Sequence, residues 1–302
     1  MKPILFNVPY QTKNEIRYLK DSIKRNHFIG NGYYTKKCQY LIQKKLNLSK
    51  VLLTDSCTSA LEMSALLIKK KGIRQEIILP SYTFPTTASA FLRAGFKLVF
   101  ADIDPKDFMI DIEDVKKKIN KNTAGIIIVH YGSFCADLNK FKKICNDNSI
   151  YLIEDAAQGF NSFLNKKSIG SFGDLSTFSF HTTKNIHAGL SGALVVNNKK
   201  FIKKADYIWE RGTDRKKVIE GKAKKYSWVE IGGSFYPTEL QAAFLYAQLK
   251  KLKENKSYRK KIYYTYYRNL INLKKSNLIY FPEITSNYDS NFHSFWILLK
   301  TA

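Results

Sequence analysis

The stretch LSTFSFHTTKNIHAGLSG, residues 175–192, places a single lysine directly after a strand-like run. The run 175–181 is typical of a β-strand, and a second run, ALVVNN (193–198), follows after a short connection. Because only the residues around Lys184 separate the two, one of these strands is expected to be antiparallel. A lysine in such a connection would be partly desolvated, which lowers its pKa and favours the neutral, nucleophilic amine.

Further strand-like runs precede this stretch, with helical patterns between them. The runs are VLLT (51–54), EIILP (76–80), KLVFADI (97–103), GIIIVHY (125–131) and SIYLIEDA (149–156). A helix is predicted over 57–70, where Ser59 and Glu62 form a capping-box pattern and Gly72 is a stop signal. The alternation predicts an α/β fold with a mostly parallel central sheet and helices on both faces.

The composition limits the possible functions. The 302 residues, 44% of them hydrophobic, suffice for one large domain or two of ordinary size. No apolar stretch approaches the ~20 residues of a membrane helix, and the start of the chain turns polar too early for a signal peptide. The four cysteines show no metal-binding spacing, so we expect free thiols in a cytoplasmic protein without a metal site. The net charge of +25 admits nucleic acid, an anionic membrane or anionic substrates as partners, but lysines spread along the chain favour an ordinary solvated surface.

The ends of several predicted strands carry chemically distinct residues, and ligands of open α/β sheets bind at such ends. Thr58 and Ser59 begin a helix, where free N–H groups attract anions. Tyr82 and Phe84 follow the next strand, and Glu154 and Asp155 end a very apolar one, where a carboxylate needs a partner. Each residue alone has an ordinary structural explanation: a helix cap, core packing or a salt bridge. Together with Lys184 they supply what pyridoxal phosphate requires, namely an anion cradle, a stacking ring, a carboxylate and an amine.

Several motifs carry a resemblance to a known family. They are LLTDSCTSALEM (52–63), LPSYTFPTTASAF (79–91), FADIDP (100–105), VHYG (129–132), IEDAAQG (153–159), FSFHTTKN (178–185) and ELQAA (239–243). On these motifs the chain resembles the DegT/DnrJ/StrS sugar aminotransferases, pyridoxal-phosphate enzymes of fold type I, the aspartate-aminotransferase fold. FIGNGYYTKKCQ (28–39), RGTDR (211–215) and KYSWVEIG (225–232) are similar to the sub-type that forms dTDP-4-amino-4,6-dideoxygalactose.

The resemblance implies pyridoxal 5′-phosphate as the cofactor and assigns roles to matching residues. The implied cofactor-binding residues are Thr58, Ser59, Phe84, Asp155, Gln158, Ser179, Lys184 and Ser234. Lys184 would be the catalytic residue that binds the aldehyde and shuttles a proton. Asp155 would pair with the pyridinium nitrogen, and Gln158 would hydrogen-bond the ring hydroxyl. The hydroxyl groups would hold the phosphate, and Phe84 would stack on the ring.

The implied assembly is a homodimer with shared active sites. Ser234 stands where the family has an asparagine that reaches the phosphate of the partner subunit. Three further residues are expected near the substrate: His181, Tyr226 and His293.

The implied reaction moves an amino group from L-glutamate to the 4-keto carbon of a nucleotide-linked 6-deoxy sugar, dTDP-4-keto-6-deoxyglucose. Such products enter cell-surface polysaccharides, including lipopolysaccharide O-antigen and enterobacterial common antigen. A related dehydratase is disfavoured because such enzymes replace the lysine with histidine, whereas this chain has Lys184. The alternative is a catalytically impaired, truncated homologue that acts as a binding protein or has no function. The family's glycine-rich sequence is replaced here by Gly-Leu-Ser-Gly at 189–192.

Two domains are expected. Residues 1–245 would form the large cofactor-binding α/β domain with an N-terminal arm, and 246–302 the start of a small, incomplete C-terminal domain. A long helix is predicted from about Thr238, with the Tyr/Lys-rich part 256–268 as a solvated face. A new β-like segment is predicted over 278–302.

Overall fold

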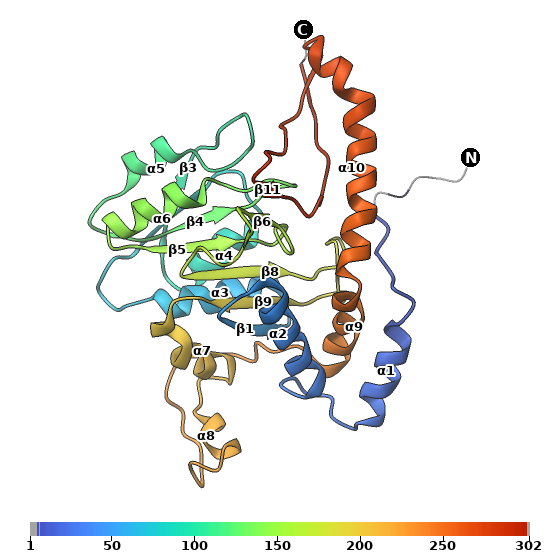
Figure 1. The fold of residues 1–302 in the computed structure, drawn as a ribbon. Helices are drawn as coiled ribbons and strands as arrows, with labels where there is room; N and C mark the ends of the chain where they lie inside the picture. Colours follow the sequence, from blue (N-terminus) through green and yellow to red (C-terminus); the bar gives the residue numbers. More distant parts are fainter. Residues whose placement is uncertain (1–4, 6, 301–302) are drawn as a thin grey trace.

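A computed structural model describes residues 5 and 7–300, and its centre is a seven-stranded sheet (Figure 1). The strand order is β1-β9-β8-β5-β4-β2-β3. The strands are β1 (Lys50–Thr54), β2 (Glu76–Pro80), β3 (Lys97–Ala101), β4 (Thr123–Val129), β5 (Tyr151–Asp155), β8 (Leu175–Ser179) and β9 (Gly192–Val196). β9 runs antiparallel to both of its neighbours, while the pairs from β8 to β3 are parallel. This confirms the mostly parallel sheet and the antiparallel strand next to the lysine.

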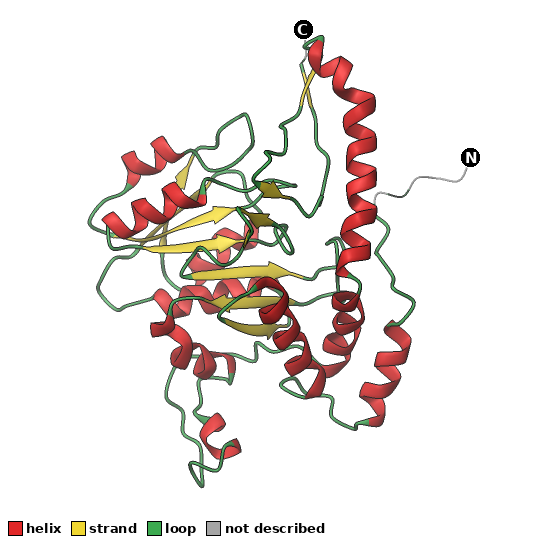
Figure 2. Ribbon diagram, in the orientation of Figure 1, coloured by secondary structure: helices red, strands yellow, loops and turns green. Residues whose placement is uncertain are grey.

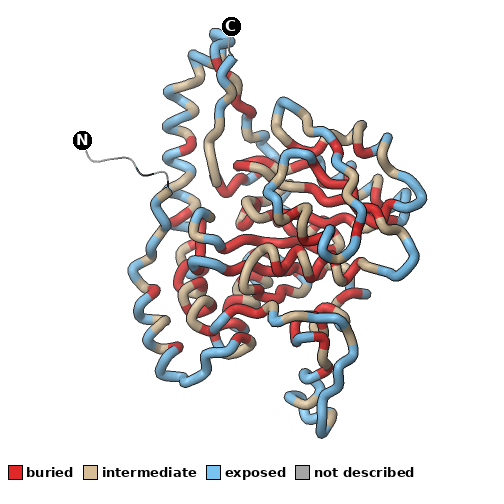
Figure 3. Tube along the Cα trace, turned by 180° about the vertical axis from the view of Figure 1, so that it is seen from behind, coloured by how far each residue is buried: buried red, intermediate tan, exposed pale blue. Residues whose placement is uncertain are grey.

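Helices cover both faces of the sheet (Figure 2). One core contains α2 (Tyr33–Leu46), α6 (Leu138–Asp147) and α9 (Glu239–Lys250). The opposite core contains α3 (Cys57–Ile68), α4 (Pro85–Arg93) and α7 (Ile202–Trp209). Side chains alternate along each strand, so Val51 and Leu53 belong to the first core and Leu52 to the second. The buried residues therefore follow the sheet, as Figure 3 shows.

The remaining elements surround this sandwich. The helices are α1 (Glu15–Lys24), α5 (Ile112–Lys118), η1 (Lys199–Phe201), α8 (Arg215–Ile219) and α10 (Leu252–Lys275). Short strands β6 (Phe163–Leu164), β7 (Lys167–Ser168) and β11 (Tyr288–Asp289) form one small sheet, and β10 (Ile279–Tyr280) pairs with β12 (Leu298–Leu299). α10 extends beyond the sheet, and the chain after it returns to pair β11 with β6 (Figure 1). Within the described residues, no helix is long and apolar enough to cross a membrane.

The predicted long helix is in fact two helices. Thr238 caps α9 and forms a capping box with Gln241, as a helix start at this position requires. Lys251 then leaves the helical conformation (φ −112°, ψ 17°) and separates α9 from α10. The apolar pattern continues through this break and gives no sign of it. The Tyr/Lys-rich part 256–268 is largely exposed, which confirms the predicted solvated face. The division into domains 1–245 and 246–302 stays a prediction.

The start of α3 also differs from the prediction. Its N-cap is Ser56, whose side chain accepts a hydrogen bond from the backbone N–H of Ser59. Ser59 is therefore inside the helix, and the capping box proposed for Ser59 and Glu62 was wrong, since Glu62 bonds Arg93 instead. The helix ends at Ile68, ahead of the glycine taken as its stop.

Candidate active site

The carboxyl ends of β8, β5, β4 and β2 meet at one edge of the sheet because these strands are adjacent and parallel. A cavity of about 520 Å³ lies there, which we call the strand-end cavity. Most of the predicted site residues line it: Thr58, Phe84, Asp155, Gln158, Ser179, His181 and Lys184. Residues separated by more than 100 positions in the sequence thus converge on one space.

The other predicted residues lie outside this cavity. Ser59 does not line the cavity, and its hydroxyl accepts a hydrogen bond from Ser56 Oγ (3.0 Å). Tyr226 is exposed, and Ser234 pairs with Glu210 in an isolated bridge. His293 faces a different cavity, described below. The expected roles of these residues toward the substrate or a partner subunit stay predictions.

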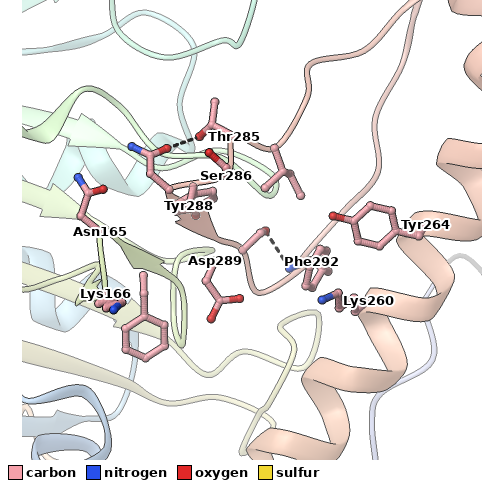
Figure 4. Close-up of a pocket in the computed structure, with 13 residues that line it drawn as sticks. Asn165, Lys166, Lys260, Tyr264, Thr285, Ser286, Tyr288, Asp289 and Phe292 are labelled. Carbon is pink, nitrogen blue, oxygen red and sulfur yellow. Dashed lines mark hydrogen bonds between the residues drawn. The ribbon is translucent and has the colours of Figure 1, made fainter.

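A larger cavity contains none of the predicted residues. It measures about 800 Å³ and lies between the β6–β7 hairpin, α10 and residues 284–292. Figure 4 shows Lys260 and Tyr264 on α10 facing this space, with Asn165 and Lys166 on its other side. Its lining, within the described residues, includes two lysines, Asp289 and several aromatic rings, but no first turn of a helix that could bind an anion, so size alone does not locate the site.

The start of α3 provides an anion-binding end of the strand-end cavity. Thr58 lies in the first turn, where backbone N–H groups have no helical partner and the helix dipole favours negative charge. The loop before β9 lies directly against this turn, because a Cβ on Gly192 would come within 2.5 Å of the Cys57 nitrogen. Ser191 Oγ donates to the Thr54 carbonyl (2.8 Å) and fixes the contact. Leu190 of the same loop lines the cavity.

The two consecutive acids at the end of β5 have separate surroundings, because neighbouring strand residues point to opposite faces. Asp155 lines the cavity. Its Oδ2 accepts a hydrogen bond from Thr87 Oγ1 (2.7 Å) and its Oδ1 one from the Ala157 N–H (3.1 Å). Both oxygens are thereby oriented while the carboxylate still faces the space.

Glu154 is fully buried and serves the structure. Its carboxylate accepts hydrogen bonds from the following groups: Gly170 N (2.9 Å), Phe172 N (2.8 Å), Gly173 N (2.6 Å), Ser176 Oγ (3.0 Å) and His130 Nε2 (3.2 Å). Burial raises its pKa, but the hydrogen bonds and the charge of His130 outweigh burial and lower the pKa below its usual value. Glu154 thus fastens the loop before β8 to the sheet.

The turn that carries Lys184 is held at both ends by β8 and β9. Backbone hydrogen bonds cross it from Phe180 to Ser191 (2.8 Å) and from Thr182 to Gly189 (2.8 Å). Burial lowers the pKa of the Lys184 amine, although the negative charge of Asp155 acts in the opposite direction. The neutral amine is therefore favoured relative to an exposed lysine, as a nucleophile requires.

Two more predicted residues have side chains available to a planar ligand. Gln158 Oε1 accepts a hydrogen bond from the Gly132 N–H (2.7 Å), which orients the amide at the cavity wall. Phe84 precedes α4 and leaves 71% of its surface exposed. A ring that stacked on it would cover apolar surface that solvent now contacts.

The residues of the strand-end cavity fit pyridoxal phosphate. The α3 turn with Thr58 suits a phosphate, Asp155 suits a protonated ring nitrogen, and Lys184 suits an aldehyde. Phe84 offers an aromatic face for the ring. The donor set thus matches each end of the cofactor with a group of complementary chemistry.

The sequence reasoning missed several residues of the cavity wall. Thr87 orients Asp155 from α4, and His130 connects the wall to Glu154. Tyr131 lines the cavity beside Tyr82, and their hydroxyl groups are 2.9 Å apart. Cys57 also lines it, and burial raises the pKa of its thiol. All of these residues lie within or beside the motifs quoted above. Their closeness in the sequence to the chosen residues was the signal that could have identified them.

Comparisons with known proteins agree with this geometry. The sequence pattern of the DegT/DnrJ/EryC1/StrS aminotransferase family matches residues 9–302. GDP-perosamine synthase of Vibrio cholerae is 31% identical over 290 residues, which are 94% of this chain and 73% of that protein. Helicobacter pylori PseC, an aminotransferase of pseudoaminic acid biosynthesis, has a TM-score of 0.86 and 24% identity over 99% of this chain and 78% of its own. The PMP-form structure of Spr1654 from Streptococcus pneumoniae has a TM-score of 0.89 and 21% identity over 99% of this chain and 80% of its own. These structures confirm the predicted aminotransferase fold.

Proposed function

Since this chain belongs to the DegT/DnrJ/EryC1/StrS aminotransferase family, a family of pyridoxal-phosphate-dependent transaminases, we propose that it aminates the 4-keto carbon of a nucleotide-linked 6-deoxy sugar with L-glutamate as the donor. The observation that carries the proposal is that Lys184 and Asp155 face one cavity, although Asp155 ends β5 and Lys184 lies in the turn after β8. The family membership supports amino transfer, and the cavity supplies the groups that this chemistry needs.

Each residue of the cavity has a separable task. When bound, pyridoxal phosphate supplies an aldehyde that exchanges amines and a ring that withdraws electrons. Asp155, oriented by Thr87, would keep a ring nitrogen protonated. The neutral amine of Lys184 would bind the aldehyde and would take and return the proton at the reacting carbon. Thr58 and Ser179 would hold the phosphate through their hydroxyl groups.

The identity of the sugar rests on less evidence. The motifs at 28–39, 211–215 and 225–232 support dTDP-4-keto-6-deoxyglucose as the substrate and dTDP-4-amino-4,6-dideoxygalactose as the product. GDP-perosamine synthase, which matches at 31% identity, is named for a GDP-linked sugar, so the nucleotide must be tested directly. The net charge of +25 suits a substrate with a diphosphate.

We propose a homodimer as the active form. Ser234 lies outside the strand-end cavity of its own chain, which is compatible with its expected place at the site of a second copy. Tyr226 also lies outside this cavity, and its expected contact with the substrate is kept as part of the proposal. His181 lines the cavity of its own chain and is proposed to contact the substrate there.

The decisive experiment incubates the purified protein with pyridoxal phosphate, glutamate and either dTDP-, GDP- or UDP-4-keto-6-deoxyglucose. Amination of one of these sugars, identified by mass spectrometry and NMR, is expected for the wild type and not for Lys184→Ala. Bound cofactor without amination of any keto sugar would contradict the proposal and favour an impaired homologue that only binds.

A further inference from the structure

A second cavity lies beside the turn that carries Lys184. It measures about 540 Å³ and is lined by residues 8–11, by α10 and by residues 292–295. We call it the α10 cavity. Tyr258, Tyr263, Tyr266 and Phe295 give it aromatic walls, and Arg259 projects from the same helix.

Arg259 is a cation without an anionic partner. Among the described residues that line the α10 cavity, no side chain is acidic. The guanidinium donates one hydrogen bond, from Nη1 to the His293 carbonyl (3.0 Å), although it has five N–H donors. Burial lowers its pKa, and no acidic group counteracts this effect. A half-buried guanidinium in an aromatic cavity is favourable only when an anion complements it.

The cavity is connected to the lysine turn through Asn185, the residue that follows Lys184. The Asn185 side chain donates to the Asn291 carbonyl (2.8 Å), which leaves its oxygen to accept from His293 Nδ1 (2.7 Å). The backbone carbonyl of Asn185 accepts from Asn255 of α10 (2.8 Å). Burial, then Lys184, then Arg259 lower the pKa of His293 to about 3. The histidine is therefore neutral, and both the Lys184 amine and the Arg259 guanidinium lie near enough to influence its pKa.

We propose that Arg259 binds the side-chain carboxylate of the amino donor and so makes the enzyme selective for an acidic amino acid. The inference rests on the proposed function, because it concerns the donor of that reaction. The guanidinium fork matches a carboxylate with two parallel hydrogen bonds. The aromatic walls would exclude water around this pair and strengthen it.

The position of Arg259 favours the side-chain carboxylate of the amino donor, rather than another anion, as the ligand of the guanidinium. The α-carboxylate of an amino acid is bonded to the reacting carbon and so must lie in the strand-end cavity with Lys184. Arg259 lines the neighbouring cavity, and the charges of Arg259 and Lys184 both act on His293, so we expect a group several bonds from the reacting carbon to meet the guanidinium. A diphosphate would carry more negative charge than the one cation that lines this cavity can offset.

The test compares glutamate with glutamine, two donors of equal size that differ in the charge of the far group. In the wild type we expect kcat/KM to be about 10- to 100-fold higher for glutamate, the range of a hydrogen-bonded ion pair. Arg259→Gln should remove most of this preference while leaving the KM of the keto sugar unchanged. Arg268→Gln is the matched control, because Arg268 is an exposed arginine on the same helix.

A binding measurement keeps the test independent of turnover. Glutarate, an unreactive dicarboxylate, should bind the wild type and the Arg268→Gln variant in calorimetry, and Arg259→Gln should bind it at least 10-fold more weakly. Added guanidinium ion should partly restore the lost glutamate activity if the variant is folded. Equal losses with glutamate and glutamine, an unchanged affinity for glutarate, or a raised KM for the keto sugar would each overturn the inference. If no keto sugar is aminated but glutarate binding still depends on Arg259, then the proposed substrate fails and the anion site does not.

Discussion

Replacing Glu154 by glutamine would show whether this buried acid holds the fold while its neighbour Asp155 serves the site. The carboxylate accepts five hydrogen bonds, three of them from backbone amides. Glutamine keeps one acceptor oxygen, but its NH₂ group replaces the oxygen that accepts from the Gly170 amide. Two N–H donors then face each other, and leaving the Gly170 amide without an acceptor costs about 1–3 kcal/mol. The same NH₂ group would face His130 Nε2, which now contacts this oxygen (3.2 Å).

The remaining hydrogen bonds lose the charge of their acceptor, at roughly 1 kcal/mol each. Three hydrogen bonds to the kept oxygen remain, so the sum predicts that Glu154→Gln lowers the free energy of unfolding by about 4–6 kcal/mol, close to the cost of breaking a buried ion pair. Asp155→Asn is the matched control: it loses at most about 1 kcal/mol, since it has two hydrogen bonds and its oxygen can keep one. The assay is urea unfolding at pH 7, followed by circular dichroism, with cofactor binding measured on the same samples.

The pH dependence gives a second check. The pKa of Glu154 is lower in the folded chain than its usual value of 4.5. Its stabilisation is therefore present above pH 4.5 and is lost as the pH falls through the folded pKa. The stability difference between wild type and Glu154→Gln should be constant near neutral pH and shrink in acid. Equal unfolding free energies at pH 7, or a difference that grows in acid, would refute the assignment of Glu154 to the fold.

The remaining predictions concern the cofactor and a second buried acid. Lys184→Met should abolish covalent attachment of pyridoxal phosphate, so that borohydride treatment followed by mass spectrometry shows the adduct in the wild type alone; an adduct that persisted in the variant would exclude Lys184. Asp155→Asn should weaken cofactor binding and reduce kcat at least 100-fold without loss of stability, and near-normal turnover would remove its ring-nitrogen role. Glu239→Gln should cost about 2–3 kcal/mol in urea unfolding, because Glu239 accepts hydrogen bonds from the first amides of α2, including those of Tyr34 (2.7 Å) and Thr35 (3.1 Å); unchanged stability would show that these contacts are dispensable.

Much of the site could be predicted from the sequence because it lies at strand ends. An apolar run ending in Asp155, and another followed by Lys184, fix where each side chain leaves the sheet. Parallel neighbours then bring these ends together, so short motifs were enough. The choice of Asp155 over Glu154 came from the family resemblance. The alternation places the two acids on opposite faces, and only the structure shows which face holds the cavity.

The features that the sequence did not reveal depend on contacts between distant segments. The position of His293 depends on the path by which the chain returns past α10, more than 100 residues after Asn185. Arg259 resembles the other basic residues of α10, and only packing distinguishes the helix face that meets the cavity from the solvated one. The break at Lys251 has no local signal, because apolar residues continue on both sides of it.

The β8–β9 turn also determines how Lys184 can move. Its backbone is fixed at both ends by strands in the interior of the sheet and is crossed by its own hydrogen bonds. A loop held in this way cannot act as a hinge, so the amine must travel by rotation about the four side-chain carbons. Those rotations occur within nanoseconds for a free side chain. The motion of the side chain that carries this amine should therefore not limit turnover.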